Sequence, residues 1–428
     1  MTNFEGWLQR TVPATRNERA AAFWSFAYFF ALLAGYYVLR PLRDQMGIAG
    51  GVKHLPWLFS ATFISLLLAQ PVYGALVARL PRIKFIPIVY HFFVANLLLF
   101  WVLLFLGIEP TAVARIFFVW VSVFNLFAVA VFWSFMADLF DAEQGKRLFG
   151  FIGAGGTAGA LLGPVITIWL SAPLGPVNLL IVAAIFLEIA VFCVYRLERT
   201  TAPKTHIHPA QRHIGGSAFA ALPELIRSPY LLGVAAWVSL LSFGATIAYF
   251  AQANIVSTSV HGAAAQTRVF AGIDLAVGLL SLATQFFATA HFLRRFGTGT
   301  AAAALPAVYI AGFTMLAISP SLAIIVILQA AQRWMNFAIA NPARQVFLTV
   351  VGREEKYKAK NFIDVVVYRG SDAAYGWLYS SLQLLGLTVG SIALCALPVA
   401  AGWVMLSKAL GRTQEHLANK QDAIPEGE

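Results

Sequence analysis

The chain has 428 residues, of which 59% are hydrophobic and only 11% are charged, and its mean hydropathy is +0.74. A soluble domain carries about 25% charged residues, so this composition excludes a protein whose surface mostly faces water. The net charge of +11 does not indicate nucleic-acid binding, because the basic residues lie in short segments between apolar stretches. We therefore expect membrane lipid, and no nucleic acid, around the protein.

Apolar stretches of about 20 residues recur along the chain, each long enough to cross a bilayer as a helix. They are too long and too uniformly apolar for barrel strands, so we predict an all-α integral membrane protein of about twelve spans. The predicted spans are 20–39, 56–77, 85–106, 112–136, 148–171, 176–196, 229–253, 266–289, 300–318, 321–341, 361–385 and 387–407.

The longest hydrophilic interval, residues 197–228, divides the chain into an N-terminal six-helix half (20–196) and a C-terminal six-helix half (229–407). If residues 1–19 and the tail 408–428 both lie in the cytoplasm, 23 of the 30 lysines and arginines also fall on that side. We therefore predict a protein of the bacterial inner membrane with cytoplasmic termini. Arg40, Arg43 and Lys53 would lie in outer loops, and the tail from His416 would be disordered.

Two sequence features and a set of charged residues at the span ends are relevant to transport. The segment Arg79-Leu-Pro-Arg82 follows the second span and resembles the basic loop of the major facilitator superfamily, although it is equally typical of simple positive-inside charge. Gly155, Gly159 and Gly163 give the fifth span one face without side chains, which favours close helix packing over phosphate binding. The residues predicted to form a cytoplasmic gate are Arg79, Arg82, Asp138, Lys146, Arg147, Lys358 and Lys360.

Polar side chains inside the spans indicate function, because an ionisable group in lipid is costly. Span one presents Ser25, Tyr28 and Tyr36 on the side that leads to Arg40 and Arg43. Span ten presents Gln329, Gln332, Arg333 and Asn336 within roughly 100° of its circumference. Asp274 could neutralise Arg333, carry a coupling proton or touch the solute, and Arg369 could simply pair with Asp372 at i,i+3. Glu188 reads as a lone structural acid and His91 as an interfacial residue.

Three segments in order suggest a family: Tyr37-Val-Leu-Arg40-Pro-Leu-Arg43-Asp44, Lys146-Arg147-Leu-Phe-Gly-Phe and Lys358-Ala-Lys360-Asn-Phe-Ile-Asp364. Together they resemble the bacterial and plastid ATP/ADP translocases, from the first span to the eleventh. That resemblance implies a twelve-span carrier that exchanges ATP for ADP or imports nucleotides. Within it, Arg43 replaces a family lysine beside Asp44, Asp274 matches a family aspartate, and Asp372 lies near the position of a family lysine.

We therefore predict a secondary transporter, not an enzyme, that moves an anionic small molecule such as a nucleotide by alternating access and needs no cofactor or metal. A proton-coupled carrier of another organic solute and a non-transporting sensor or scaffold are the alternatives. The predicted solute-binding residues are Arg40, Arg43, Arg115, Asn125, Arg268, Gln329, Gln332, Arg333, Asn336 and Arg369; those predicted to couple transport or pair charges are Asp44, Asp274, Asp364 and Asp372.

Overall fold

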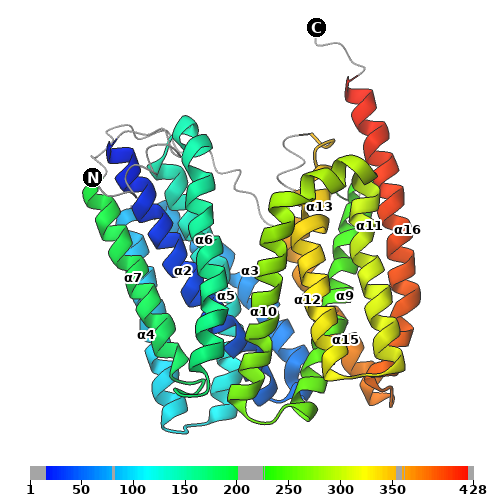
Figure 1. Ribbon diagram of the computed structural model, residues 1–428, viewed down its shortest axis with the longest axis horizontal. Coiled ribbons are helices and arrows are strands. Elements are labelled where there is room, and N and C mark those ends of the chain that lie inside the picture. Colours follow the sequence, from blue (N-terminus) through cyan, green and yellow to red (C-terminus); the bar gives the residue numbers. More distant parts are fainter. Residues whose placement is uncertain are drawn as a thin grey trace. The chain divides into compact units, whose positions relative to one another are not determined.

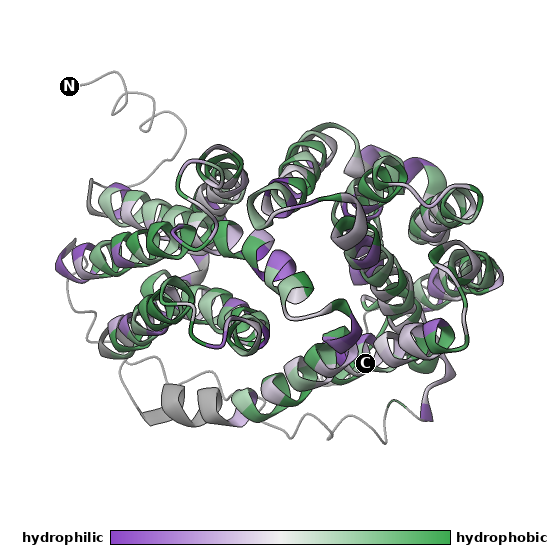
Figure 2. Ribbon diagram, turned by 90° about the horizontal axis from the view of Figure 1, so that it is seen from below, coloured by the Kyte–Doolittle hydropathy of each residue, from purple (hydrophilic) through white to green (hydrophobic). Residues whose placement is uncertain are grey.

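The computed structural model describes residues 16–79, 82–200, 225, 227–352, 359–360 and 362–422. All regular secondary structure within these ranges is helical, which confirms the predicted all-α membrane fold. Eleven helices in this part of the chain are long and apolar enough to cross a membrane. In Figure 2, hydrophobic residues make up most of the long helices, which suits a surface that faces lipid.

The first half of the sequence forms six long helices (Figure 1): α2 (Arg16–Ala49), α3 (Leu55–Arg79), α4 (Arg82–Phe105), α5 (Pro110–Leu139), α6 (Ala142–Leu170) and α7 (Leu179–Thr200). Helices α2, α3 and α5 contain their predicted spans, and α4, α6 and α7 match theirs except for one to three residues at one end. The prediction that the first span ends at residue 39 is wrong, because α2 continues through Pro41 to Ala49. A proline removes one backbone hydrogen bond, but membrane helices tolerate this loss. Arg40 and Arg43 are therefore helical residues, not loop residues.

The second half contains α9 (Pro229–Ser259), α10 (Ala263–Phe287), α11 (Thr289–Ile318), α12 (Leu322–Met335), the π-helical turn η2 (Asn336–Ala340), α13 (Asn341–Phe347), the π-helical turn η3 (Ile363–Val367), α15 (Tyr368–Leu384) and α16 (Val389–Asp422). The turn η3 and α15 occupy the predicted eleventh span. A short 3-10 helix, η1 (Val52–His54), precedes α3 in the first half.

Two ends in the second half differ from the prediction. Helix α11 begins at Thr289, well before the predicted residue 300, and the left-handed backbone of Gly297 (φ 74°) interrupts it. The residues after 407 continue α16 to Asp422, so the predicted disordered tail is wrong up to that residue, and 423–428 lie outside the described residues. Alanine, leucine, glutamine, glutamate and lysine are good helix formers, and they extend a helix that the membrane span has already nucleated.

The chain divides into two compact units. Unit 1 comprises 1–50, 68–212 and 262–275, and unit 2 comprises 51–67, 213–261 and 276–428. Each unit thus takes one short segment from the opposite half of the sequence: the start of α10 belongs to unit 1, and the start of α3 belongs to unit 2. Most of the predicted linker, 197–228, lies outside the described residues.

Close packing of α2 on α6 organises unit 1, and the glycines of α6 explain it. A Cβ atom on Gly155 would lie 2.5 Å from the carbonyl oxygen of Phe26, and one on Gly163 would lie 2.8 Å from that of Ala34. A Cβ atom on Gly159 would meet the carbonyl oxygen of Phe30. The predicted packing face is confirmed, because real side chains at these positions would push the two helices apart.

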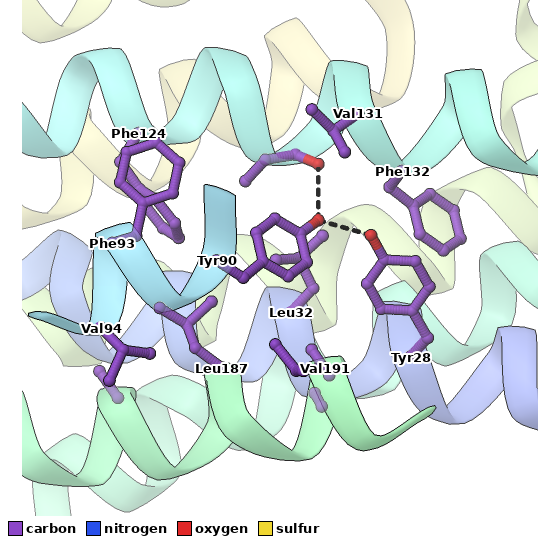
Figure 3. Packing of buried hydrophobic residues seen from close by; sticks show 14 of the residues in the cluster. Tyr28, Leu32, Tyr90, Phe93, Val94, Phe124, Val131, Phe132, Leu187 and Val191 are labelled. Atoms are coloured by element: carbon purple, nitrogen blue, oxygen red, sulfur yellow. Dashed lines mark hydrogen bonds between the residues drawn. The ribbon is translucent and has the colours of Figure 1, made fainter. Parts of the chain in front are cut away.

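The hydrophobic core of unit 1 lies between α2, α4, α5 and α7 (Figure 3). Tyr28 and Tyr90 share a hydrogen bond of 2.5 Å at its centre, and the rings of Phe29 and Phe132 stack 4.0 Å apart. Ser25 and Tyr28 are completely buried. These two residues of the polar side of span one therefore pack inside the unit.

Glycine residues also allow close helix packing at two places in unit 2. Helices α11 and α16 meet where Gly299 faces Gly411, and a Cβ atom on Gly411 would collide with the Cα atom of Gly299. A Cβ atom on Gly244 of α9 would lie 2.7 Å from the ring of Tyr309 on α11. Polar contacts accompany these approaches: Tyr309 of α11 donates to Gln332 of α12, and Trp237 of α9 donates to Ser407 of α16.

Candidate functional site

An ion pair links α2 to the middle of α10 within unit 1. The Nη1 atom of Arg40 lies 3.6 Å from Oδ1 of Asp274, and the arginine side chain is 17% exposed while the aspartate is 1% exposed. The guanidinium carbon also lies 5.6 Å from the centre of the Tyr37 ring. Arg333 was the partner considered for Asp274 from the sequence, whereas the ion pair observed is with Arg40. The carboxylate is buried behind a partly accessible cation.

Two further arginines stabilise the same end of α2. Arg43 donates to Oδ1 of the buried Asp44 from both Nε, at 3.1 Å, and Nη2, at 2.7 Å. Its guanidinium carbon lies 5.0 Å from the centre of the Phe118 ring on α5. Arg115, also on α5, donates from Nε to the carbonyl oxygen of Gly50 at 2.8 Å and so caps the chain where α2 ends. Arg115 therefore has a structural contact at a position predicted to bind solute.

A polar cluster of unit 2 surrounds Asp372 of α15. One carboxylate oxygen accepts from Ser242 Oγ at 2.5 Å and from Thr246 Oγ1 at 3.4 Å, both on α9. The other accepts from Arg369 Nη1 at 3.3 Å. The arginine side chain is 41% exposed and the aspartate 11% exposed. As at Arg40 and Asp274, the accessible member of the pair is the cation.

A second hydroxyl network continues on the same two helices. Ser239 of α9 lies 2.8 Å from the Ser371 hydroxyl and 2.9 Å from the Tyr375 hydroxyl, both on α15. Sequence reasoning missed the contribution of α9, although Ser239, Ser242 and Thr246 fall on one helical face at i, i+3 and i+7. That spacing was the available signal.

The polar stripe of α12 faces α11. Tyr309 of α11 donates to Gln332 Oε1 at 2.8 Å, and Gln332 Nε2 donates to Gln329 Oε1 at 2.9 Å. Both glutamines are buried, whereas Arg333 is half-buried. Asn336 is half-buried at the start of η2. The two glutamines thus bind protein groups, and Arg333 and Asn336 are the more accessible members of the predicted set.

The remaining predicted solute-binding residues are dispersed. Asn125 is half-buried on α5, and Arg268 is exposed near the start of α10. Asp364 forms an ion pair with Arg344, at 2.8 Å, in which the aspartate is the more exposed partner. In the Arg40 and Arg369 pairs the arginine is the more exposed partner, so Asp364 differs in this respect from Asp274 and Asp372.

The predicted gate residues lie at helix ends. Asp141 begins α6 with a capping box, accepting from Gln144 N at 2.8 Å. Next to it, Lys146 pairs with Glu143 at 3.2 Å, and Arg147 lies 3.6 Å from Glu18 at the start of α2. Asp138 is exposed in the last turn of α5, and Lys360 donates to Gln345 at 3.0 Å. Lys358 and the side chains of Arg79 and Arg82 lie outside the described residues.

Comparison with known proteins settles the family. Residues 20–357 match the sequence model of the Major Facilitator Superfamily, which is most of the chain. The chain belongs to the Major Facilitator Superfamily. It is therefore a membrane transporter, not an enzyme. No curated protein matches the sequence.

Three solved structures of superfamily-type transporters share this fold. A bacterial homologue of the human lysosomal transporter Spinster, inward-facing and unoccupied, is 13% identical, with a TM-score of 0.58 over 94% of this chain and 99% of that one. The nucleoside transporter NupG, as a mutant, is 14% identical, with a TM-score of 0.61 over 94% and 100%. An inward-facing bacterial homologue of the iron transporter ferroportin is 11% identical, with a TM-score of 0.64 over 93% and 98%. At these identities the likeness concerns the fold alone.

Membership of the superfamily suggests how the charged pairs inside the spans could relate to a solute. Transporters of this architecture hold their solute near the middle of the membrane, between two repeated halves that rock against each other. Arginine is suited to carboxylate and phosphate, because its planar guanidinium can donate two parallel hydrogen bonds. Within the described parts of both units, the arginines of the Arg40 and Arg369 pairs have this capacity while keeping a buried counter-charge.

Proposed function

We propose that this transporter carries an anionic solute by alternating access. The observation that supports it is that, in two ion pairs inside the spans, the arginine is more exposed than the aspartate. Arg40 is 17% exposed and Asp274 is 1% exposed. Arg369 is 41% exposed and Asp372 is 11% exposed. An approaching solute meets the guanidinium first and the carboxylate second. A cation would meet repulsion at both places, so the arrangement favours an anion.

We further propose that the solute is a phosphate compound of the nucleotide class, exchanged for a related compound as ATP is for ADP. The segments that resemble ATP/ADP translocases support this choice, and they contain Arg40, Arg43 and Asp44. Exchange suits a site whose cations are already neutralised by buried acids. A bound anion then competes for the guanidinium, and the carboxylate reclaims it when the anion leaves.

Uptake into liposomes tests both parts of the proposal. Purified protein is reconstituted with or without internal ADP, and uptake of labelled ATP is measured for wild type, Arg369→Gln, Arg333→Ala and the control Arg412→Gln. Arg412 is an exposed arginine on α16. We expect internal ADP to stimulate uptake, Arg369→Gln and Arg333→Ala to reduce it at least tenfold, and Arg412→Gln to leave it unchanged. If folded protein transports another anion but no nucleotide, the nucleotide part is wrong; if it transports only cations or neutral solutes, the whole proposal is wrong.

One observation favours a second candidate, proton-coupled transport. Asp372 is buried, with Ser242 and Thr246 as neutral donors and Arg369 as its cationic one. Protonation would release Arg369 to the solute while both hydroxyls still contact the carboxyl group. A fluorescent pH indicator inside the liposomes distinguishes the mechanisms: solute-dependent acidification that disappears in Asp372→Asn indicates coupling, and uptake without a pH change indicates exchange.

A further inference from the structure

A half-exposed imidazole and a half-exposed carboxyl group meet on two helices of unit 1. Nε2 of His91 on α4 lies 3.4 Å from Oε2 of Glu188 on α7. The side chains are 49% and 46% exposed. The sequence-based view that Glu188 is a lone acid is wrong, because His91 of the adjacent helix α4 is its partner. Helices α4 and α7 lie side by side (Figure 1).

The pair lies deep within the apolar part of these helices. His91 follows the start of α4 by nine residues, and Glu188 follows the start of α7 by nine residues. At 1.5 Å per residue, each lies about 13 Å along its helix from the nearer end, and both fall within the predicted spans 85–106 and 176–196, which cross a hydrocarbon core of about 30 Å. A lipid headgroup at the membrane surface does not reach that depth. The pair is therefore surrounded by acyl chains unless protein covers it.

The surface around the pair is apolar. A groove of about 540 Å³ runs along the two helices, lined by Val94 and Leu98 of α4 and by the side of α7 from Ile181 to Phe192. Glu188 is the one polar residue of this lining. Phe92 and Ile185 are each more than half exposed beside it. Apolar residues alone would suit lipid, so the ion pair is the feature that acyl chains do not explain.

The pair is incompletely satisfied. In the part of the chain that the structure describes, neither side chain has an ion pair or hydrogen bond beyond the 3.4 Å contact. A carboxylate has about four acceptor positions and an imidazole has a second ring nitrogen, so most of this capacity is unused. An unsatisfied polar group in hydrocarbon costs several kcal/mol, and buried ionisable groups in membranes normally pair within a protein interior.

We propose that the α4–α7 face is an interface with a second copy of this transporter. A two-fold axis through this face brings the same surface of the two copies together. His91 of each copy then meets Glu188 of the other, and the two acids and two imidazoles alternate in one cluster. Exposed apolar side chains of the face, such as Phe92 and Ile185, pack around it. The side chains of the chain itself select this occupant, because an acid that accepts hydrogen bonds and an imidazole that can donate one are present on the same face.

A complementation experiment tests the interface. Full-length His91→Glu protein carries two acids on this face, and Glu188→His protein carries two imidazoles. Differently tagged copies are reconstituted alone and mixed in lipid nanodiscs. Pull-down and mass photometry give the dimer fraction. We expect wild type to dimerise, each variant alone to dimerise about tenfold more weakly, and the mixed variants to form heterodimers. A tenfold change corresponds to about 1.4 kcal/mol.

Controls separate this interface from a merely structural role. The exchanged variant His91→Glu/Glu188→His keeps the pair within each copy and should regain wild-type dimerisation. Leu394→Asp introduces an acid on an exposed residue of unit 2 and should leave dimerisation unchanged. Wild-type protein that stays monomeric at every protein-to-lipid ratio would overturn the proposal, as would single variants that dimerise like wild type. Glu188-dependent capture of a different membrane protein in place of a second copy would also overturn it.

Discussion

Arg40 and Asp274 form an ion pair between a helix of the first half of the sequence and a helix of the second, within one compact unit. The aspartate is almost completely buried and the arginine is not. Removing one member of a buried pair is more destabilising than removing both, because a single buried charge remains without compensation. The contribution of the pair to the free energy of unfolding can therefore be measured separately from any role in transport, by comparing single and double variants.

Asp274→Ala should lower the free energy of unfolding by about 2 kcal/mol. Breaking a fully buried pair costs about 3–5 kcal/mol, and the smaller value reflects the partial exposure of Arg40. The double variant Arg40→Met/Asp274→Leu should lie within about 1 kcal/mol of wild type, since two apolar side chains replace the pair. Equilibrium unfolding in detergent measures all three proteins.

The matched control is Arg268→Met on the same helix. Arg268 is exposed and has no ion pair within the described residues, so its replacement should change the unfolding free energy by less than about 0.5 kcal/mol. A double variant less stable than Asp274→Ala would show that Arg40 contributes through other contacts, and the loss in Asp274→Ala could not then be assigned to the ion pair.

The glycine face of α6 gives a steric prediction. Gly159→Val should lower the unfolding free energy by about 3 kcal/mol or prevent accumulation of folded protein, because the new side chain would collide with the backbone of α2 at Phe30. Gly153→Val on the same helix should change it by less than about 1 kcal/mol, since a Cβ atom there meets nothing within 4 Å. Thermal unfolding of the purified variants checks both; equal effects would contradict the packing model.

Local features of this fold could be read from the sequence, whereas long-range pairs could not. The spans were predictable because each needs only an uninterrupted apolar run, and the α6 face because glycines at four-residue spacing align on any helix. The Arg369–Asp372 contact was predictable because residues at i,i+3 are neighbours. Helix ends were less certain: Pro41 suggested an end that the membrane environment overrides, and the tail after residue 407 continues a helix already formed.

The partners of Asp274, Asp372 and Glu188 lie on other helices, and helical periodicity does not reveal them. A polar stripe shows which side of a helix turns inward, but the neighbour and its vertical register depend on how all the helices pack. Asp372 illustrates the limit: its arginine was evident from spacing, while Ser242 and Thr246 come from α9. The sequence shows which charged residues lie in apolar spans, but their hydrogen-bond and ion-pair partners depend on how the helices pack.

Asp372 should weaken anion binding at Arg369, because the two negative groups compete for one guanidinium. In the uptake assay, Asp372→Asn should lower the KM for ATP about fivefold, equivalent to about 1 kcal/mol. Ser242→Ala keeps the charge of Asp372 and removes one donor, so it should change KM less than twofold while lowering the unfolding free energy by about 1 kcal/mol. A KM that rises in Asp372→Asn would mean that the carboxylate itself binds the solute.

Breaking the hydrogen-bond network of Tyr309, Gln332 and Gln329 tests whether the buried amides of α12 bind the solute or stabilise the fold. Tyr309→Phe removes the 2.8 Å bond to Gln332 and leaves a buried oxygen without that donor. We expect the unfolding free energy to fall by about 1 kcal/mol and the KM for uptake to stay within twofold of wild type. Tyr195→Phe, at an exposed tyrosine of α7, is the control and should change neither. A large rise in KM without loss of stability would instead place the amides in the solute site, because only a direct contact would weaken binding while leaving the helices equally well packed.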